Sequence, residues 1–446
     1  LCFGKVPGSS PLAAAALVGL GRIALGQGQY DRATERFDRA LALDSTSIQA
    51  AVLRAIAMAR AGKVEQAREE FEKVLRLDPL NHAALRELAL LSDGVEAPYR
   101  ARLDRMLADD PHYRLDLACF YLDARLSQDA AAILREAAEV WDHAMVAYLA
   151  GEVELFRANE GAADKWFERA AAGTLHLVFP SRLEEVNALT HALMRNPKDA
   201  HACYALGNFF YAHERFDEAI RLWEQAAQTL VSFDVLHRNL GLAYRDRRND
   251  PERAIEEFEK ALALNPNNQD LYPELNRLYA ARGLSQKRAE LLESILAIRE
   301  PRDDVHKLSI FMLVEMGDYE SAIRKLATEQ FVASEMDQSF RDAYVRAYLA
   351  RAEVSMRTGC TAEAIADYIQ ALEYPQNVGV GRPVSPRQAK ILYLLGCANE
   401  QVGRFQDALA AWKQAAGEHH SHGSELYPYL QMSLDKLNRY SEIRFF

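Results

Sequence analysis

The sequence predicts an all-α protein, an α-solenoid of about eleven helix-turn-helix repeats that ends in a capping helix. The first observation is an alanine followed four residues later by a large apolar side chain, which recurs nine times in 446 residues. The second is a period of 34 residues where repeats run on without interruption, as from Ala33 to Ala67. The nine pairs are Ala33/Phe37, Ala67/Phe71, Ala130/Leu134, Ala163/Phe167, Ala219/Trp223, Ala254/Phe258, Ala322/Leu326, Ala364/Tyr368 and Ala408/Trp412.

Small residues at fixed places are the third observation. In seven of the nine pairs another alanine follows the large residue by three positions, so that small, large and small side chains share one helical face. Twelve residues before the first alanine of several pairs lies a glycine, as at Gly21, Gly207 and Gly396. Each repeat is therefore expected to be two antiparallel helices in close approach. With prolines such as Pro79 and Pro266 closing the repeats, the pattern resembles the tetratricopeptide repeat family.

The register of the repeats predicts the organisation of the chain. The run 173–199 is expected to be an internal seam with one added helix, capped at Ser181 and with Glu184 as the capping-box partner. A longer connection is expected around 330–344. The full prediction is an N-terminal tail at 1–13, an N-terminal repeat block at 14–172 with a degenerate repeat at 82–110, the seam at 173–199, central repeats at 200–336, C-terminal repeats at 337–422 with a Gly/Pro loop at 374–388, and a capping helix at 423–446.

Three stretches suggest a narrower resemblance. They are Phe179-Pro-Ser-Arg-Leu with the added helix behind it, Arg238-Asn-Leu-Gly-Leu-Ala-Tyr, and the loop from Tyr374 to Pro383. Together they resemble, over residues 110–446, the repeat tail of an uncharacterised bacterial family whose front half is a galactose-mutarotase-like β-sandwich. The resemblance implies a sugar-related setting and assigns no reaction to the tail. Because the chain begins with Leu1, we expect an upstream segment that is missing here.

Composition excludes several classes of function. The net charge of −11 argues against a nucleic-acid binder, because such binding depends on an excess of Lys and Arg. The five cysteines have no paired short spacing, which favours neither disulfides nor zinc and suggests a reducing, cytoplasmic compartment. The apolar stretch Leu12–Leu20 is too short to span a membrane.

No catalytic motif is present in the sequence. There is no His-Glu-x-x-His zinc motif and no phosphate-binding loop, so we expect a non-enzymatic protein without a cofactor. The cluster His419, His420 and His422 could hold a metal, with Glu418 and Glu425 nearby. We interpret it instead as a solvated loop before the capping helix, and predict no metal site.

The inner wall of the array is the expected binding surface. Helical spacing directs the same positions of each first helix into the concave face of a solenoid. Over residues 144–336 those positions are rich in tyrosines and cations, which suit flat contacts and forked bonds to carboxylates. The candidate binding residues are Tyr148, His201, Tyr204, Asn208, Tyr211, Arg238, Asn239, Arg245, Arg277 and Lys307.

Two alternatives remain open at this wall. Arg238, Arg245 and Arg277 could instead neutralise neighbours such as Glu152, Asp246 and Glu274, which would leave a solvated channel. The favoured function is a scaffold that binds an extended peptide or a partner domain. The second hypothesis is an accessory tail of a carbohydrate-active protein, in which the groove contacts glycan or completes the site of an upstream domain. Self-association through the ends of the array is a third.

Overall fold

The computed structural model describes residues 12–92, 98–108, 111–175, 178–331, 339–379, 381–383, 387–417 and 427–443. Every regular element among these residues is helical, and the β-type pairing they contain is an isolated bridge between His143 and Thr174. The all-α prediction is confirmed. The chain divides into two compact units, Leu1–Asp250 and Pro251–Phe446. The boundary falls between the two helices of one repeat.

The first unit contains five consecutive helix pairs, an added helix, a sixth pair and the first helix of the next repeat. These are α1 (Ala13–Gly26), α2 (Tyr30–Leu43), α3 (Ile48–Arg60), α4 (Val64–Leu77), α5 (His82–Leu91), α6 (Pro98–Leu107), α7 (Pro111–Asp123), α8 (Ser127–Val140), α9 (Ala144–Phe156), α10 (Glu160–Ala170), α11 (Leu183–Arg195), α12 (Ala200–Ala212), α13 (Phe216–Ala227), α14 (Asp234–Ala243) and a π-helical turn, η2 (Tyr244–Arg248). Two helix pairs cover residues 13–77, one pair lies within 82–107, and one helix, α11, lies between the fifth and sixth pairs.

The second unit continues the alternation of first and second helices. Its elements are α15 (Pro251–Leu264), α16 (Leu271–Arg282), α17 (Ser285–Leu296), α18 (Asp303–Glu315), α19 (Tyr319–Thr328), α20 (Ser339–Arg357), α21 (Thr361–Leu372), a short 3₁₀ turn η3 (Gln376–Val378), α22 (Ala389–Gln401), α23 (Phe405–Ala416) and α24 (Tyr427–Ile443). As predicted, the last helix packs against the preceding repeat, where α24 contacts both α22 and α23.

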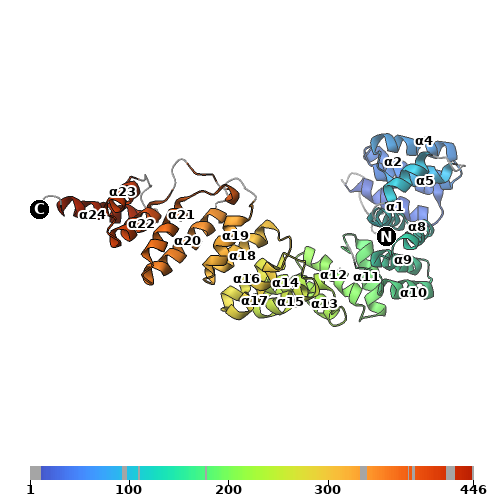
Figure 1. The fold of residues 1–446 in the computed structure, drawn as a ribbon. Helices are drawn as coiled ribbons and strands as arrows, with labels where there is room; N and C mark the ends of the chain where they lie inside the picture. Colours follow the sequence, from blue (N-terminus) through green and yellow to red (C-terminus); the bar gives the residue numbers. More distant parts are fainter. Residues whose placement is uncertain are drawn as a thin grey trace. The chain divides into compact units, whose positions relative to one another are not determined.

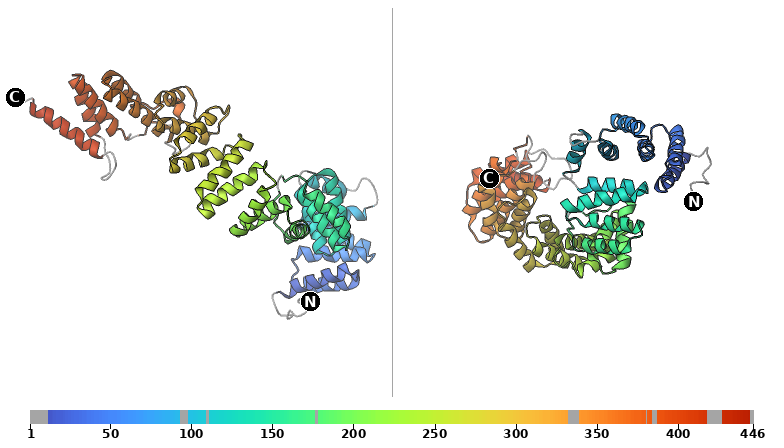
Figure 2. Two further views of the ribbon diagram at one scale, coloured as in Figure 1. Left: turned by 90° about the horizontal axis from the view of Figure 1, so that it is seen from below. Right: turned by 90° about the vertical axis from the view of Figure 1, so that its right-hand side faces the viewer.

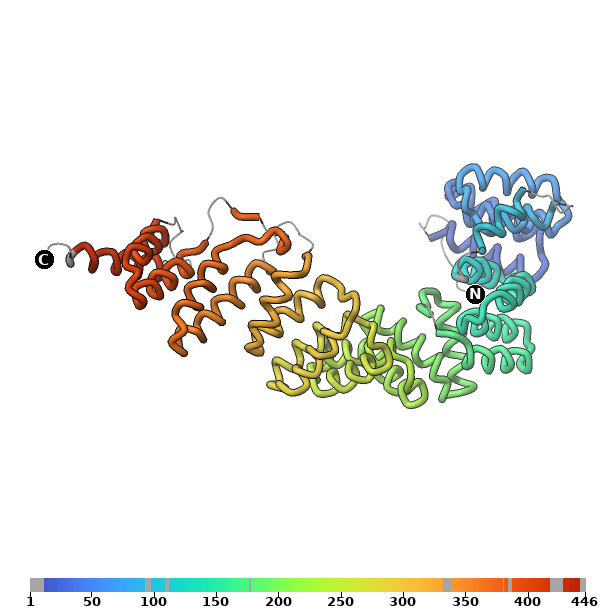
Figure 3. Tube along the Cα trace, in the orientation of Figure 1, coloured from blue at the N-terminus to red at the C-terminus, as the bar shows by residue number. Residues whose placement is uncertain are grey.

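Helices stack in the manner of a solenoid within each unit. Most helices pack on the next one in the chain, whereas the added helix α11 packs on α9 and α12. First helices of neighbouring repeats also touch, as α1 does α3 and α16 does α18. The ribbon and tube show this back-and-forth course (Figures 1 and 3), and Figure 2 shows the successive helix pairs of each unit from two further sides. In the first unit one continuous apolar core extends from Val18 to Leu206.

Glycines allow the two helices of a repeat to approach. A Cβ atom on Gly21 would lie 2.5 Å from the Phe37 ring, and one on Gly207 would lie 2.4 Å from Nε1 of Trp223. Gly396 faces Trp412 in the same way, at 2.3 Å. Real Cβ atoms do not come this close to other atoms. The twelve-residue spacing in the sequence therefore marks a direct glycine-to-aromatic contact.

Two glycines of one repeat should respond to alanine with opposite signs. A Cβ on Gly151 would lie 2.5 Å from the buried Phe167 ring, whereas a Cβ on Gly161 would meet no atom within 4 Å. Gly151→Ala should lower the free energy of unfolding of α9 and α10 by about 1–3 kcal/mol, because the core must shift. Gly161→Ala should raise it by about 0.5 kcal/mol by restricting the unfolded chain. Hydrogen exchange of the α9–α10 peptides measures both, and equal signs would contradict the contact.

Helix α1 contacts a segment that lies about one hundred residues later in the sequence. Arg22 on α1 pairs with Asp123 at the end of α7, with 2.6 Å between Nη2 and Oδ2. Near the same place a Cβ on Gly26 would lie 2.4 Å from the Cβ of Arg125. The end of α1 therefore packs on the turn between α7 and α8. The sequence pattern predicts contacts between neighbouring repeats and did not predict this one.

Two local expectations were wrong. The added helix begins at Leu183 with Arg182 as its N-cap, and Glu185 accepts the backbone N–H groups of Ser181 (2.7 Å) and Arg182 (3.0 Å), so that Glu184 is not the capping partner. The connection expected at 330–344 is shorter, because α20 already begins at Ser339. The predicted tail up to residue 11 and the cluster of His419, His420 and His422 lie outside the described residues.

Candidate partner-binding surface

Two of the expected binding tyrosines are core residues. Tyr148 on α9 is 0% exposed, and its hydroxyl donates to Oδ1 of Asp199 at 2.8 Å. Asp199 also caps α12 by accepting the N–H of Ala202, so this bond ties α9 to the start of the next repeat. Burial and the Asp199 carboxylate raise the pKa of Tyr148. Tyr204 on α12 is 2% exposed, and its ring packs edge-on against Phe233. Neither side chain has surface to offer a partner.

Three further candidates on α12 are engaged within the first unit. His201 Nδ1 lies 3.3 Å from the carbonyl of Ala170, and burial lowers its pKa. Asn208 donates from Nδ2 to the carbonyl of Val178 at 3.2 Å. Tyr211 is half-buried between Phe216 and Trp223, with ring centroids 5.0 and 5.1 Å away. These side chains stabilise the contacts of α12 with its neighbours.

The predicted cations of the first unit also have intramolecular contacts. Arg238 donates to Oδ1 of Asn239 at 3.4 Å, while no described group accepts its buried Nε–H. Arg245 donates two hydrogen bonds to the carboxylate of its sequence neighbour Asp246, from Nε at 2.5 Å and from Nη2 at 2.7 Å. Glu152 pairs with His191 instead of with these arginines, with 2.6 Å between its Oε2 and Nδ1 of the imidazole.

The two candidates of the second unit lie on successive first helices. Arg277 on α16 is exposed and pairs with Glu274 one turn earlier, as the neutralising alternative expected. The ammonium of Lys307 on α18 lies 4.9 Å from the centre of the Phe340 ring. Nine of the ten predicted residues therefore lie on first helices, and Arg245 lies in the turn η2 that follows α14. Most of their polar groups already have partners within the protein.

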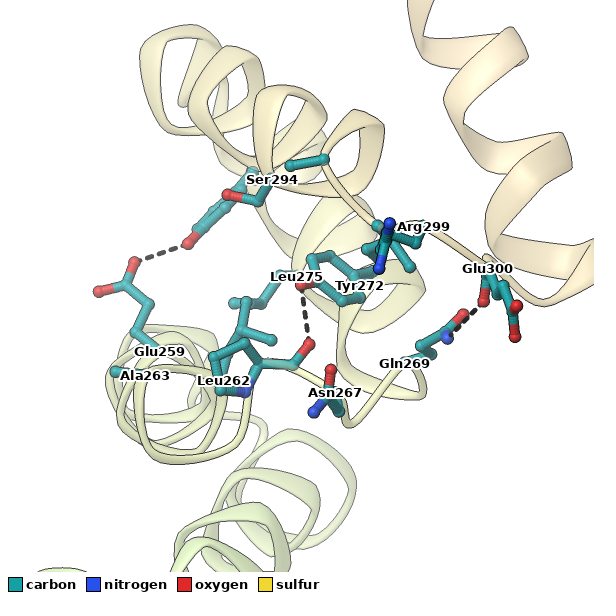
Figure 4. Close-up of a pocket in the computed structure, with 14 residues that line it drawn as sticks. Glu259, Leu262, Ala263, Asn267, Gln269, Tyr272, Leu275, Ser294, Arg299 and Glu300 are labelled. Carbon is teal, nitrogen blue, oxygen red and sulfur yellow. Dashed lines mark hydrogen bonds between the residues drawn. The ribbon is translucent and has the colours of Figure 1, made fainter.

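One hollow of the second unit lies against α16 and the second helices α15 and α17. It holds about 1230 Å³ and is lined by apolar residues such as Leu262, Leu275 and Ile298. Small side chains line it at the end of α17, namely Ser294 and the C-cap residue Ala297. Figure 4 shows Tyr272 and Gln269 bonded to backbone carbonyls at one end of this hollow.

Polar groups in this hollow are largely satisfied by one another. Tyr279 donates to Glu259 Oε1 at 2.8 Å and Lys287 Nζ lies 2.5 Å from the same oxygen. Tyr272 donates to the carbonyl of Pro266 at 3.0 Å. Gln269 donates to the carbonyl of Glu300 and accepts the N–H of Arg302. Few directed groups remain for a ligand, so this hollow is a gap in helix packing.

A second groove lies on the first helices of the same unit. We call it the first-helix groove; it holds about 800 Å³, and side chains from the first helices α18, α20 and α22, from the capping helix α24 and from the second helix α21 line it. Its apolar part includes the buried Tyr368 and half-buried side chains, namely Val314, Leu349, Ala350, Met356, Leu394 and Tyr429. Since α18 contacts α20 and α22 contacts α24, the groove follows consecutive repeats.

Cations surround the apolar part of the first-helix groove. Arg346 and Lys390 are exposed, and within the described parts of the chain neither has a carboxylate partner. Lys390 Nζ lies 5.8 Å from the centre of the Tyr429 ring. Arg357 is also exposed and pairs with Glu353, one turn earlier on α20, at 2.5 Å. This combination of apolar side chains and available charge distinguishes the groove from the hollow between second helices.

Sequence reasoning missed the first-helix groove because it confined the inner wall to residues 144–336. The signal was present in the sequence. Arg346, Leu349, Glu353 and Met356 recur every three to four residues along α20 and so share one helical face. Extending the same first-helix positions into the last two repeats would have selected them.

Comparisons with known proteins agree with this geometry. Models of the tetratricopeptide repeat match residues 24–91, 186–235 and 235–268. The chain contains tetratricopeptide repeats. Such repeats are generally protein-interaction scaffolds. The narrower family with an upstream β-sandwich does not appear among these matches.

Curated proteins match a part of the chain. RNA polymerase-associated protein CTR9 of Caenorhabditis elegans is 33% identical over 153 residues, which are 33% of this chain. The chain spans only 13% of that protein's length, so the match concerns a small part of it.

Several solved structures are similar to this chain at low scores. Yeast Tom70 is 15% identical with a TM-score of 0.28, covering 97% of both chains. A tetratricopeptide repeat protein from Parabacteroides merdae is 16% identical with a TM-score of 0.28, covering 56% of this chain and 92% of that one. Pseudomonas aeruginosa pilF is 20% identical with a TM-score of 0.29, covering 49% and 89%. Likenesses at these scores carry no argument about partners.

Other kinds of site were sought among the described residues. No three His, Cys, Asp or Glu side chains there gather closely enough to hold a metal ion. No helix in the same residues has the length and apolar character needed to cross a membrane.

Proposed function

We propose that this chain is a non-enzymatic scaffold and that its first-helix groove receives an extended polypeptide segment of a partner. The supporting observation is that consecutive first helices place half-buried apolar side chains beside exposed cations that have no described carboxylate partner. Binding energy at protein interfaces comes mainly from a few apolar contacts that lose water, surrounded by a polar rim. Leu349, Met356 and Leu394 supply such contacts here.

A random peptide library screened against the full chain tests this proposal. Leu394→Asp should weaken the selected peptides by about tenfold or more, because it places a charge in the apolar part of the groove. Leu264→Asp is the matched control, since Leu264 is an exposed leucine at the end of α15 and does not line the groove. Circular dichroism verifies that both variants fold. Equal binding by the two variants would place the site elsewhere.

The carbohydrate alternative depends on the sequence resemblance alone. A glycan-binding wall requires exposed aromatic faces, and on α12 Tyr204 is buried and Tyr211 is half-buried. An upstream β-sandwich in the complete gene, together with glycan binding by the repeats, would revive this alternative.

A further inference from the structure

Building on the proposed function, we infer that the segment bound in the first-helix groove is acidic, with carboxylate side chains on either side of one or more apolar residues. The three cations of the groove are Arg346, Lys390 and Arg357, and its carboxylate among the lining residues is Glu353. The groove therefore carries an excess of positive charge in a chain whose net charge is −11. An acidic partner would be repelled by most of this protein and attracted to this groove.

The cations are placed where a bound segment would meet them. Arg346 and Arg357 both lie on α20, eleven residues apart, which is about 16 Å along a helix axis. Leu349, Ala350 and Met356 lie between them on the same helix. An extended chain of about five residues covers that distance. A segment with acidic residues about five positions apart and an apolar residue between them fits this arrangement.

Available charge is the second element of the argument. Arg346 has no ion-pair partner within the described residues, so a partner's carboxylate would compete only with water there. Lys390 contacts the Tyr429 ring and is likewise not neutralised by a described carboxylate. Arg357 would exchange Glu353, an exposed partner on its own helix, for a partner's carboxylate. Exposed pairs of that kind are weak, so this exchange costs little.

Three fluorescein-labelled peptides of twelve residues, identical except for their polar positions, test this inference with the full chain. Each peptide alternates leucine with glutamate, glutamine or lysine. The glutamate peptide should bind about tenfold tighter than the glutamine peptide, and its affinity should fall as salt is added. The lysine peptide should bind weakest. Equal affinity of the glutamate and glutamine peptides would overturn the acidic preference.

Charge reversal identifies the surface responsible. Arg346→Glu with Lys390→Glu should weaken the glutamate peptide by about 30-fold or more and strengthen the lysine peptide. Arg277→Glu is the matched control, since Arg277 is an exposed arginine of the same unit that does not line the groove. If the control weakens the glutamate peptide as much as the double variant, general electrostatic attraction explains the binding and the inference fails.

Failure of the inference is distinguishable from failure of the proposed function. Peptides that bind without acidic preference, yet lose affinity in Leu394→Asp, would retain the groove and reject the charge. Peptides that are indifferent to Leu394→Asp, or that do not bind at all, would reject both. A twelve-nucleotide RNA is the remaining comparison, because phosphates are also anionic. Preference for RNA over the glutamate peptide would overturn the choice of an acidic polypeptide.

Discussion

Replacing Glu87 with alanine should lower the free energy of unfolding of the surrounding repeats by about 3–5 kcal/mol. The Glu87 carboxylate is 0% exposed. It accepts two bonds from Arg60, at 2.9 and 3.0 Å, and a third from the Tyr121 hydroxyl at 2.7 Å. Removing it leaves an arginine without its main counter-charge in a buried setting. Hydrogen exchange of α3, α5 and α7 measures the loss locally, which suits a repeat protein better than one global transition.

Charge balance in this cluster supplies a sharper test than the single variant. Arg86 pairs with Asp129 at 3.0 Å, so the cluster holds two cations and two carboxylates. The double variant Arg60→Met with Glu87→Leu removes one of each and leaves that second pair intact. It should recover most of the stability lost in Glu87→Ala, because apolar residues can replace a buried ion pair at little cost. A loss equal to the sum of the single variants would contradict this account.

A surface carboxylate of the same repeat block is the control for Glu87. Asp104 pairs with Arg100 one turn away on α6, and both side chains are more than half exposed, at 53% and 59%. Exposed pairs of this kind contribute less than about 1 kcal/mol. Asp104→Ala should therefore leave exchange in α3, α5 and α7 nearly unchanged. A large effect there would mean that charge changes in general, and not the buried network, control stability.

Replacing Trp412 with alanine should have the other large effect, a loss of about 3–5 kcal/mol in the last repeat and its cap. Trp412 is 0% exposed, packs directly on Gly396, and donates from Nε1 to the carbonyl of Tyr393 at 3.3 Å. Its ring also lies 5.7 Å from that of Tyr440 on the capping helix. Losing this ring would leave a cavity where α22, α23 and α24 meet. Exchange in α24 should rise most, because that helix packs on α22 and α23, which the Trp412 ring joins.

Two other substitutions test the contributions of the indole N–H and of burial. Trp412→Phe should cost less than about 1.5 kcal/mol, because a buried aromatic ring is retained at small loss of volume. Phe37 and Phe167 occupy the equivalent place beside Gly21 and Gly151, which shows that phenylalanine suits this contact. Trp166→Ala should also cost less, since Trp166 is half-buried. If Trp166→Ala and Trp412→Ala were equal in effect, the burial argument would be wrong.

Much of the fold could be predicted because the repeat pattern is a packing rule. A glycine twelve residues before the alanine of a pair predicts a close helix contact, and Gly21, Gly151, Gly207 and Gly396 all make it. The boundary of α20 could not be predicted in the same way. No repeat marker lies in the preceding segment, and α20 begins at Ser339, within the segment that was expected to be a connection.

The binding surface was less predictable than the helices. Spacing places Tyr148 and Tyr204 on first helices, and it cannot say whether neighbouring helices cover them. Tyr148 is buried, and its hydroxyl donates a hydrogen bond to Asp199, 51 residues later in the chain. Tyr204 is buried, and the Phe233 ring packs on its ring. Whether a first-helix residue is exposed depends on the residues that oppose it from the next repeat. That information is distributed along the chain and has no local signature.

By itself the sequence determined that this protein is built from paired helices, which residues of each pair touch, and that a last helix covers the array. These features follow from contacts within one repeat or between neighbours, where spacing alone sets which side chains meet. Only the tertiary structure decided that Arg22 reaches Asp123, that Glu87 is buried among arginines, and that an open groove with available cations lies on α20 and α22. Those features depend on how helices that are far apart in the sequence approach one another in space. A periodic sequence pattern does not specify those contacts.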